Sequence, residues 1–347
     1  MKLNWRVLAG LLAAASPGVM AQSAWRSVAV PYYMPPAYVQ GLQIGWYAPR
    51  SREFGASAHA LLDATSAYCA GEPLAPARDA WRSALLAWDR VGTVAIGPLI
   101  ERRSARRIDF GAVRPALLAR AIETHPASEA DMERIGSPAK GFAALEALLW
   151  PSAATRGTPA CDYAVQAATD IAREADALAG AFDPAGRAEP DEEATVAAMA
   201  EAVNQWIGGL DTLRSVAFER PLRERQARGR SPLQFARDAS GASAAERDAR
   251  WQSLAALAVF EGGEAPAPGA GLVPLEPYLR GKGLNPLADK LVAAVRRAGR
   301  AVEATHRATP ATVQAAALAL ADLKALVETE VAPALEIRVG FTEADGD

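Results

Sequence analysis

Histidine and cysteine, the side chains that most often carry catalysis and bind transition metals, are scarce in this sequence. Its 347 residues include only three histidines (His59, His125 and His306) and two cysteines. No two histidines form a His-Glu-x-x-His pair, and no serine lies in a Gly-x-Ser-x-Gly elbow. These absences exclude the common zinc-protease motif and the usual nucleophile turn of serine hydrolases.

The sequence also lacks a strong excess of charge. The formal net charge is −3, and the arginines that cluster at 102–107 and 220–230 are interleaved with acidic residues, without an aromatic ladder. We therefore expect salt-bridged or solvated faces there and no nucleic-acid partner. Beyond the N-terminus no run of about 18 apolar residues occurs, so no transmembrane segment is expected in the mature chain.

The N-terminus has the pattern of a signal peptide. Lys2 and Arg6 precede a short apolar run at 7–15, and small residues flank Met20 at positions 19 and 21. This pattern predicts a signal peptide over 1–21 with cleavage near Ala21. The mature protein is then expected to be exported, periplasmic and soluble.

That compartment changes what the two cysteines imply. Cys69 and Cys161 form an even pair in an oxidising space, which favours a disulfide, with two buried free thiols as the alternative. A disulfide that closes so long a loop would stabilise the fold by about 4–5 kcal/mol in the chain-entropy model.

Alternating strand patterns are missing, whereas helix starts are frequent. Proline follows a capping residue at 137–138, 158–159, 285–286 and 309–310, and capping boxes are predicted at Ser128/Asp131 and Ser243/Glu246. Apolar residues recur at helical spacing between these starts. Helices are predicted at 54–70, 77–92, 114–124, 128–149, 159–182, 191–217, 243–261, 286–308 and 310–331. The fold class is therefore all-α.

The polar stretch 181–193 is the best candidate for a connection between two halves. It predicts two helical bundles, an N-terminal one over 22–185 and a C-terminal one over 186–347. The aromatic, proline-bearing segment 28–46 is expected to form a short extended N-terminal arm. The proline- and glycine-rich loop 262–286 is expected to lie on the surface or carry function.

One carboxylate, Glu146, lies within the apolar stretch KGFAALEALLW at 140–150. On a helical wheel Glu146 falls at the margin of the apolar face. It is either a rim residue that reaches water or a partly buried carboxylate that needs a partner.

The string from Gly141 to Glu146 resembles a variant of the Gly-x-His-x-x-Glu motif of the imelysin family. The segments 80–99, 106–115 and 327–347, with its Gly-Phe and Asp-Gly-Asp tail, are similar to family segments in the same order. The resemblance implies an all-helical, two-bundle, exported protein associated with iron uptake or the bacterial envelope. Some members pair the motif histidine and glutamate as proposed metal ligands, but here the histidine position is Ala143, which has no ligand atom.

Two kinds of partner for Glu146 stay open. Arg107 or Arg114 would form a charge-assisted pair with it, and this is the favoured alternative. Carboxylates would instead converge on iron or another divalent cation, with Glu146 and Asp109 as ligands and Asp89 and Glu101 in the same bundle. Further pocket candidates, for which core packing is the simpler explanation, are Trp81, Trp88 and Phe142. The basic segment 225–238 is expected to enter a helix that either holds an anion or is merely capped at the surface.

The leading functional hypothesis is an exported imelysin-like binding or accessory protein, not a catalyst. Its ligand would lie in a cleft near Glu146, Asp109 and the arginines of 102–114, in a process linked to iron. One alternative is a metal-dependent peptidase, as the family name suggests. Another is a structural envelope protein that docks a membrane partner through loop 262–286 or the 28–46 arm.

Overall fold

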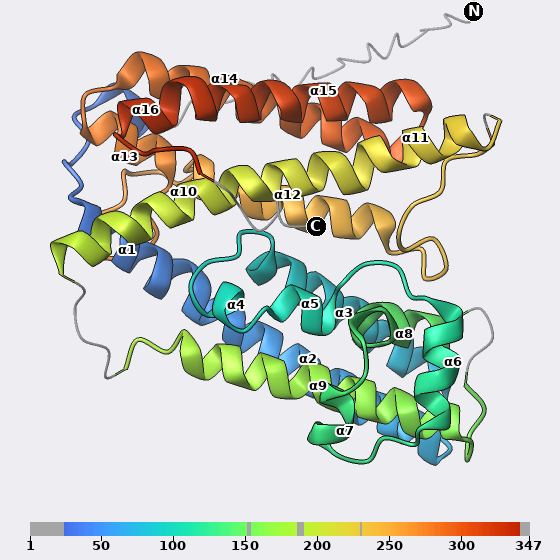
Figure 1. The fold of residues 1–347 in the computed structure, drawn as a ribbon. Helices are drawn as coiled ribbons and strands as arrows, with labels where there is room; N and C mark the ends of the chain where they lie inside the picture. Colours follow the sequence, from blue (N-terminus) through green and yellow to red (C-terminus); the bar gives the residue numbers. More distant parts are fainter. Residues whose placement is uncertain (1–23, 151–153, 186–190, 230, 341–347) are drawn as a thin grey trace, which may run out of the picture.

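The computed structural model describes residues 24–150, 154–185, 191–229 and 231–340, and within these ranges the chain is helical and contains no strand (Figure 1). The predicted all-α bundle fold is confirmed. The expected signal peptide at 1–21 and the Asp-Gly-Asp tail at 345–347 lie outside the described residues.

The helices form two layers, and the first half of the chain builds the lower layer in Figure 1. Its long helix α2 packs along both α3 and α9, and α8 lies against α3 and α9. These four helices are α2 (Ala48–Ala70), α3 (Leu74–Gly92), α8 (Gly141–Leu149) and α9 (Pro159–Ala181). Between α3 and α8 the chain forms the short elements α4 (Pro98–Glu101), α5 (Ser104–Ile108), α6 (Pro115–Glu123), α7 (Glu129–Glu133) and η3 (Ser137–Ala139).

The second half builds the upper layer. Its long helices are α10 (Glu192–Arg214), α12 (Ser243–Ala258), α14 (Asn285–Ala304) and α15 (Pro310–Leu326), with the shorter α11 (Arg220–Ala227), α13 (Leu275–Gly281), η5 (Thr305–Arg307) and α16 (Ala332–Ala334). Helix α14 packs between α12 and α15, and α15 also contacts α10. The layers meet where α12 packs on α3, which brings distant parts of the sequence together.

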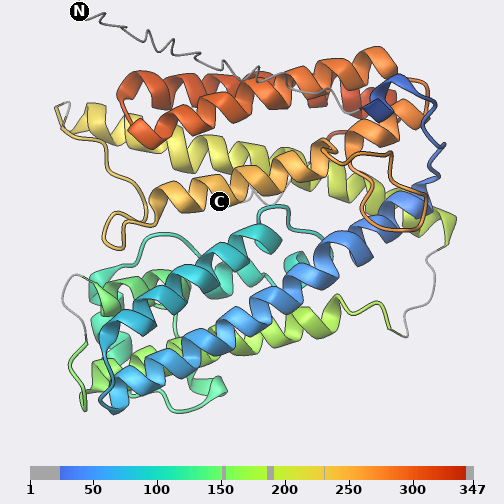
Figure 2. The same ribbon diagram turned by 180° about the vertical axis from the view of Figure 1, so that it is seen from behind.

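The N-terminal arm is less extended than expected. Residues 28–34 have no regular structure, whereas η1 (Ala24–Ser27), α1 (Pro35–Leu42) and η2 (Gln43–Tyr47) are helical. The arm crosses to the upper layer, as the view from behind shows (Figure 2). There Arg26 pairs with Glu276 at 2.5 Å, and the hydroxyl of Tyr33 donates to the carbonyl of Pro266 at 2.6 Å.

Several helix ends follow the predicted caps, and others do not. Proline opens α9 and α15, and the capping box at Ser128 and Asp131 is present. Helix α14 instead begins at Asn285, so the predicted cap is its first residue and Pro286 its second. The prediction of a capping box at Ser243 and Glu246 is wrong, because α12 starts without a side-chain cap. The predicted helix 128–149 is broken into α7, η3 and α8. Gly141, at the second break, adopts a left-handed φ of 66°.

Three long helices contain a π-helical turn that sequence reasoning did not predict. These are η2, η4 (Ser215–Glu219) and η6 (Val327–Val331), and each is followed by a helix with proline at its second position, namely Pro49, Pro221 or Pro333. Proline has no N–H to donate, and its ring pushes away the carbonyl four residues back. The helices therefore continue through proline by widening one turn instead of ending.

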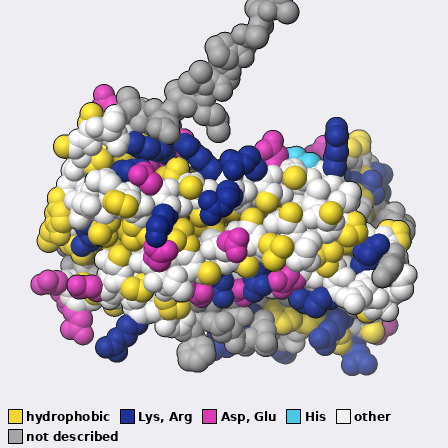
Figure 3. Space-filling view, turned by 90° about the horizontal axis from the view of Figure 1, so that it is seen from above, with side chains coloured by type: hydrophobic (Ala, Val, Ile, Leu, Met, Phe, Trp, Pro, Cys, Tyr) yellow, Lys and Arg dark blue, Asp and Glu magenta, His cyan; other side chains and the backbone are white. Residues whose placement is uncertain are grey.

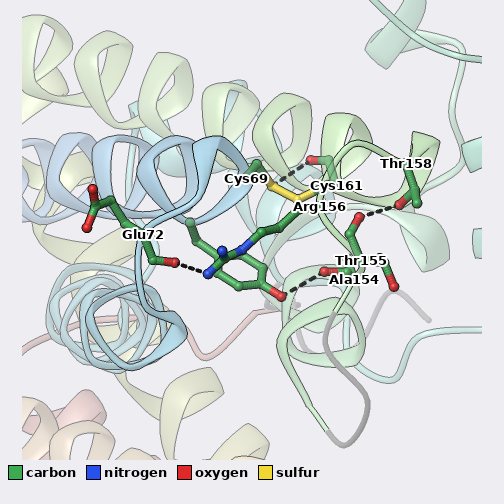
Figure 4. Close-up of a disulfide and its surroundings, with 8 residues drawn as sticks. Cys69, Glu72, Ala154, Thr155, Arg156, Thr158 and Cys161 are labelled. Carbon is green, nitrogen blue, oxygen red and sulfur yellow. Dashed lines mark hydrogen bonds between the residues drawn. A yellow bond between two sulfur atoms is a disulfide. The ribbon is translucent and has the colours of Figure 1, made fainter.

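The predicted disulfide between Cys69 and Cys161 is present and joins the end of α2 to the start of α9 (Figure 4). Hydrogen bonds support the same corner. The hydroxyl of Tyr68 donates to the carbonyl of Ala154 at 2.8 Å, and Arg156 donates to the carbonyl of Glu72 at 2.6 Å. The crosslink thus fixes two of the longest helices of the lower layer to each other.

Among the described residues, the segment Pro310–Ala334 is long and apolar enough to cross a membrane by length and composition. In the fold its side chains Val313, Ala316, Leu320 and Leu323 are buried, and α15 packs on α10 and α14. The face seen from above Figure 1 mixes apolar side chains with acidic and basic ones (Figure 3). About one third (33%) of the most apolar window of this segment is buried in the fold, and Leu318 is exposed.

Candidate functional site

Glu146 lies on α8 at the boundary between the layers and is 6% exposed. Its Oε1 accepts hydrogen bonds from the backbone N–H of Ser240 at 3.0 Å and from the Ser240 hydroxyl at 2.6 Å. Its Oε2 lies 3.6 Å from a guanidinium nitrogen of Arg237. All three contacts come from one loop of the second half of the chain, so Glu146 ties the lower layer to the upper one.

Arg237 is buried, 3% exposed, and its guanidinium joins three carboxylates. Besides Glu146 it pairs with Asp109, which follows α5, and lies 3.6 Å from Glu246 of α12. Burial disfavours the charge of Arg237, but the neighbouring carboxylates outweigh it and raise the pKa of the guanidinium. The expected entry of this segment into a helix is wrong, because residues 231–242 form a loop.

The arginines expected to pair with Glu146 lie elsewhere. Arg107 pairs with Asp170 of α9 at 3.1 Å and with Glu129 at 3.5 Å. Arg114 is exposed, and its backbone N–H donates to the carbonyl of Pro138. Sequence reasoning thus named the right kind of partner for Glu146 but the wrong residues, because the actual partner is 91 positions away in the other layer.

Steric constraints explain why a glycine opens the motif. Gly141 has a φ of 66°, and a Cβ there would collide with the backbone carbonyl of Ile108. This close approach holds the end of α5, and with it Asp109, against the start of α8. Ala143 is 8% exposed and offers no ligand atom.

A second arginine, Arg250 of α12, lies among three carboxylates beside Arg237. Its Nε donates to Asp89 at 2.8 Å, and its Nη2 donates to Glu246 at 2.8 Å and to Asp109 at 3.3 Å. Oxygen atoms of these three carboxylates lie within 4.8 Å of one another, a donor set that suits a hard cation. The guanidinium already donates to all three, so it takes the place that a cation would have.

Asp89 is the most deeply buried carboxylate of this cluster. It is 2% exposed, and its Oδ2 accepts no hydrogen bond from another described residue. Burial raises the pKa of Asp89 well above its ordinary value, and the negative charges of Glu246 and Asp109 add to this, while Arg250 opposes it. Burial of Asp89 therefore favours its protonated form.

A cavity of about 700 Å³ lies between the layers, and its wall includes Asp89, Asp109, Arg237, Glu246 and Arg250 but not Glu146. Helices α3, α5, α10 and α12, the π turn η4 and the loop before α12 enclose it. Among its described lining residues are six arginines, three carboxylates and several apolar side chains. The charged ones are Arg103, Arg106, Arg220, Arg237, Arg247, Arg250, Asp89, Asp109 and Glu246.

The structure divides the remaining predicted pocket residues between cavity and core. Trp88 lines the cavity together with Asp89 and Asp109. Trp81 and Phe142 are fully buried in the core, where the indole N–H of Trp81 donates to the carbonyl of Phe142 at 3.1 Å.

Sequence reasoning missed Arg237, Ser240, Glu246 and Arg250 as site residues. Glu246 was interpreted as part of a capping box, although its position four residues before Arg250 also matches a helical ion pair. This spacing was the signal in the sequence from which Glu246 and Arg250 could have been predicted as partners.

None of the three histidines lines the cavity. His59 pairs with Asp176, and His306 pairs with Asp248, both at exposed positions. His125 is also exposed. Since both cysteines form the disulfide, the described lining contains no histidine or free thiol to act as base or nucleophile.

Comparison with known proteins identifies the family. The family model for imelysin (peptidase M75) matches residues 48–334. The chain belongs to the imelysin family. No curated protein matches the chain significantly.

Two solved structures share the imelysin fold of this chain. An imelysin-like protein from Psychrobacter arcticum is 21% identical, with a TM-score of 0.69 over 90% of this chain and 100% of that one. A candidate iron-regulated protein A precursor from Parabacteroides distasonis is 16% identical, with a TM-score of 0.68 over 84% of this chain and 93% of that one. At these identities the comparison shows the fold alone.

The metal pair that the imelysin motif implies does not fit the residues present here. Position 143 is alanine, and both oxygens of Glu146 are engaged by Ser240 and Arg237. The nearby carboxylates are bridged by Arg250. In this imelysin the carboxylates that could coordinate a metal are therefore paired with arginine side chains.

Proposed function

We propose that this imelysin is an exported binding or accessory protein of iron uptake or the cell envelope, and not a catalyst. The observation that carries the proposal is the cavity of about 700 Å³ between the layers, with its charged wall and without histidine or free cysteine among its described lining residues. Such a cavity can hold a ligand through fixed charges, and its described lining offers neither the histidine base nor the cysteine nucleophile that many hydrolases use. Membership of the family supports the link to iron and export.

Glu146 acts in this proposal as a clamp between the layers and not as a metal ligand. Its contacts with Ser240 and Arg237 position the loop 231–242, which contributes Phe235 and Arg237 to the cavity. Residues 1–21 would direct export.

Loop 262–286 is a weaker candidate for docking a membrane partner, because it packs against the protein's own arm. A Cβ at Gly41 would collide with the backbone of Gly271, and Tyr33 bonds to Pro266. Much of the loop is therefore engaged within the chain.

Growth under iron limitation tests the role of the cavity. A strain that lacks the protein should grow poorly and recover with the wild-type chain. Ala217→Phe, which fills the cavity, should fail to restore growth, whereas Ala119→Phe at an exposed position of α6 should restore it. Equal rescue by both variants would contradict a function in the cavity.

Metal analysis and a protease assay separate the alternatives. The mature protein from Gln22 and its Glu146→Ala variant are both expected to contain no stoichiometric iron, because arginines occupy the carboxylates. Iron present in the wild type and lost in the variant would restore the metal-site alternative. Cleavage of unfolded casein by the pure protein would restore the alternative that the protein is a peptidase.

A further inference from the structure

Arg247 of α12 is a buried guanidinium in the cavity wall that forms no ion pair with a carboxylate in the described part of the chain. It is 5% exposed, and its Nε and Nη1 make no hydrogen bond with another described residue. Its flat face packs on Phe235, with 4.5 Å between Cζ and the ring centroid. Arg237 and Arg250, on the same cavity, each form ion pairs with three carboxylates.

An unpaired buried guanidinium destabilises the fold, because its charge loses water without gaining a counter-ion. Burial lowers the pKa of Arg247, and the charges of Asp248, Glu246 and Asp238 offset this only in part. Stacking on Phe235 recovers less free energy than a charge-assisted hydrogen-bond partner would supply. The fold thus keeps a donor whose partner is not among the described residues.

The surroundings define what that partner would be. The stack orients the guanidinium plane, and the N–H groups along a guanidinium edge match the two oxygens of a carboxylate. The same cavity is lined by the apolar side chains of Trp88, Leu213 and Val216. A ligand that fills it needs both an anionic and an apolar part.

We propose that the cavity binds an organic carboxylate, with the carboxylate held by Arg247 and an apolar body against Trp88, Leu213 and Val216. The inference rests on the proposed binding function and adds the chemical class of the ligand. Arg103 and Arg106, which also line the cavity, would favour the approach of an anion.

The test compares an acid with its neutral isostere. Binding of 2-naphthoate and 2-naphthamide to the full mature chain is followed by tryptophan fluorescence, since Trp88 lines the cavity. The wild type should prefer the acid at least tenfold. Arg247→Met should remove that preference and leave the amide unaffected, and Arg247→Lys should keep part of it. Arg300→Met, which removes an exposed charge on α14, is the matched control and should bind both probes like the wild type.

Stability gives an independent readout. Without ligand, Arg247→Met should melt at the same temperature as the wild type or higher, because it removes an unpaired buried charge. A marked drop in melting temperature would make Arg247 structural and overturn the proposal. So would an unchanged affinity for naphthoate in both Arg247 variants. If inorganic phosphate displaces bound naphthoate as effectively as unlabelled naphthoate would, the proposed contact of an apolar ligand body with the cavity is overturned.

The outcomes also separate this inference from the proposed function. Acid and amide bound equally by the wild type would refute the anion assignment and leave a ligand cavity. Binding of neither probe would overturn the carboxylate assignment, whereas the proposed function is decided by the growth assay with Ala217→Phe.

Discussion

Removal of the Glu146 carboxylate is predicted to destabilise the protein strongly. Glu146→Ala deletes two hydrogen bonds to Ser240, each to a charged acceptor and worth about 1.5–3 kcal/mol, and leaves the Ser240 donors buried. It also leaves Arg237 with one carboxylate fewer. Breaking a buried pair from one side costs about 3–5 kcal/mol, which is the loss expected in the free energy of unfolding.

Glu146→Gln separates hydrogen bonding from charge. The amide oxygen can still accept from Ser240, whereas the attraction to Arg237 is lost, so we expect a smaller loss of about 1–2 kcal/mol. Ser240→Ala should be non-additive with Glu146→Gln, because both changes act on one network.

Urea unfolding followed by circular dichroism measures these differences. The control is Glu53→Ala, which breaks a surface pair with Arg90 at 2.8 Å and should cost less than about 1 kcal/mol. If Glu146→Ala is no more harmful than Glu53→Ala, Glu146 does not clamp the layers, and the account of the site given above is wrong.

Three further predictions concern the same fold. Replacing both Cys69 and Cys161 with serine should lower stability by about 4–5 kcal/mol, and reduction of the wild type should reproduce the drop in melting temperature, whereas no change would exclude a stabilising crosslink. Gly141→Ala should cost more than about 3 kcal/mol in urea unfolding, since its Cβ meets the Ile108 carbonyl; a cost near the propensity difference of about 1 kcal/mol would argue against that close approach. The raised pKa of Asp89 stabilises the fold fully below its unfolded value of about 4, and this contribution is lost as pH rises through the folded pKa. Asp89→Asn should therefore gain stability relative to wild type between pH 4 and pH 7, and parallel profiles would contradict the assignment.

Local features of the fold could be predicted from the sequence because they depend on neighbours along the chain. Proline at the starts of α9 and α15 predicted those ends correctly, and the cysteine pair predicted the disulfide. The same logic failed at Glu246, where a possible cap turned out to be an ion-pair partner of Arg250.

The partners across the layers could not be predicted in this way. Which loop meets Glu146 depends on how α12 packs on α3, and no short spacing encodes the 94 residues between Glu146 and Ser240. The wheel placed Glu146 at the margin of an apolar face, and the structure shows why a charge is tolerated there. A charged partner arrives from the other layer.

The docking of the N-terminal arm onto the upper layer has a consequence for how the chain folds. Trp25 and Tyr33 are buried, and Arg26 pairs with Glu276, 250 residues away. If the protein is exported from its N-terminus, these residues leave the membrane first and find their binding surface only after residues 260–281 have followed. Contacts at such separation form slowly, because the entropy of closing the loop is lost before the contact is gained. The beginning of the mature chain is therefore expected to be the last part to fold, exposed meanwhile to proteases and chaperones of the compartment.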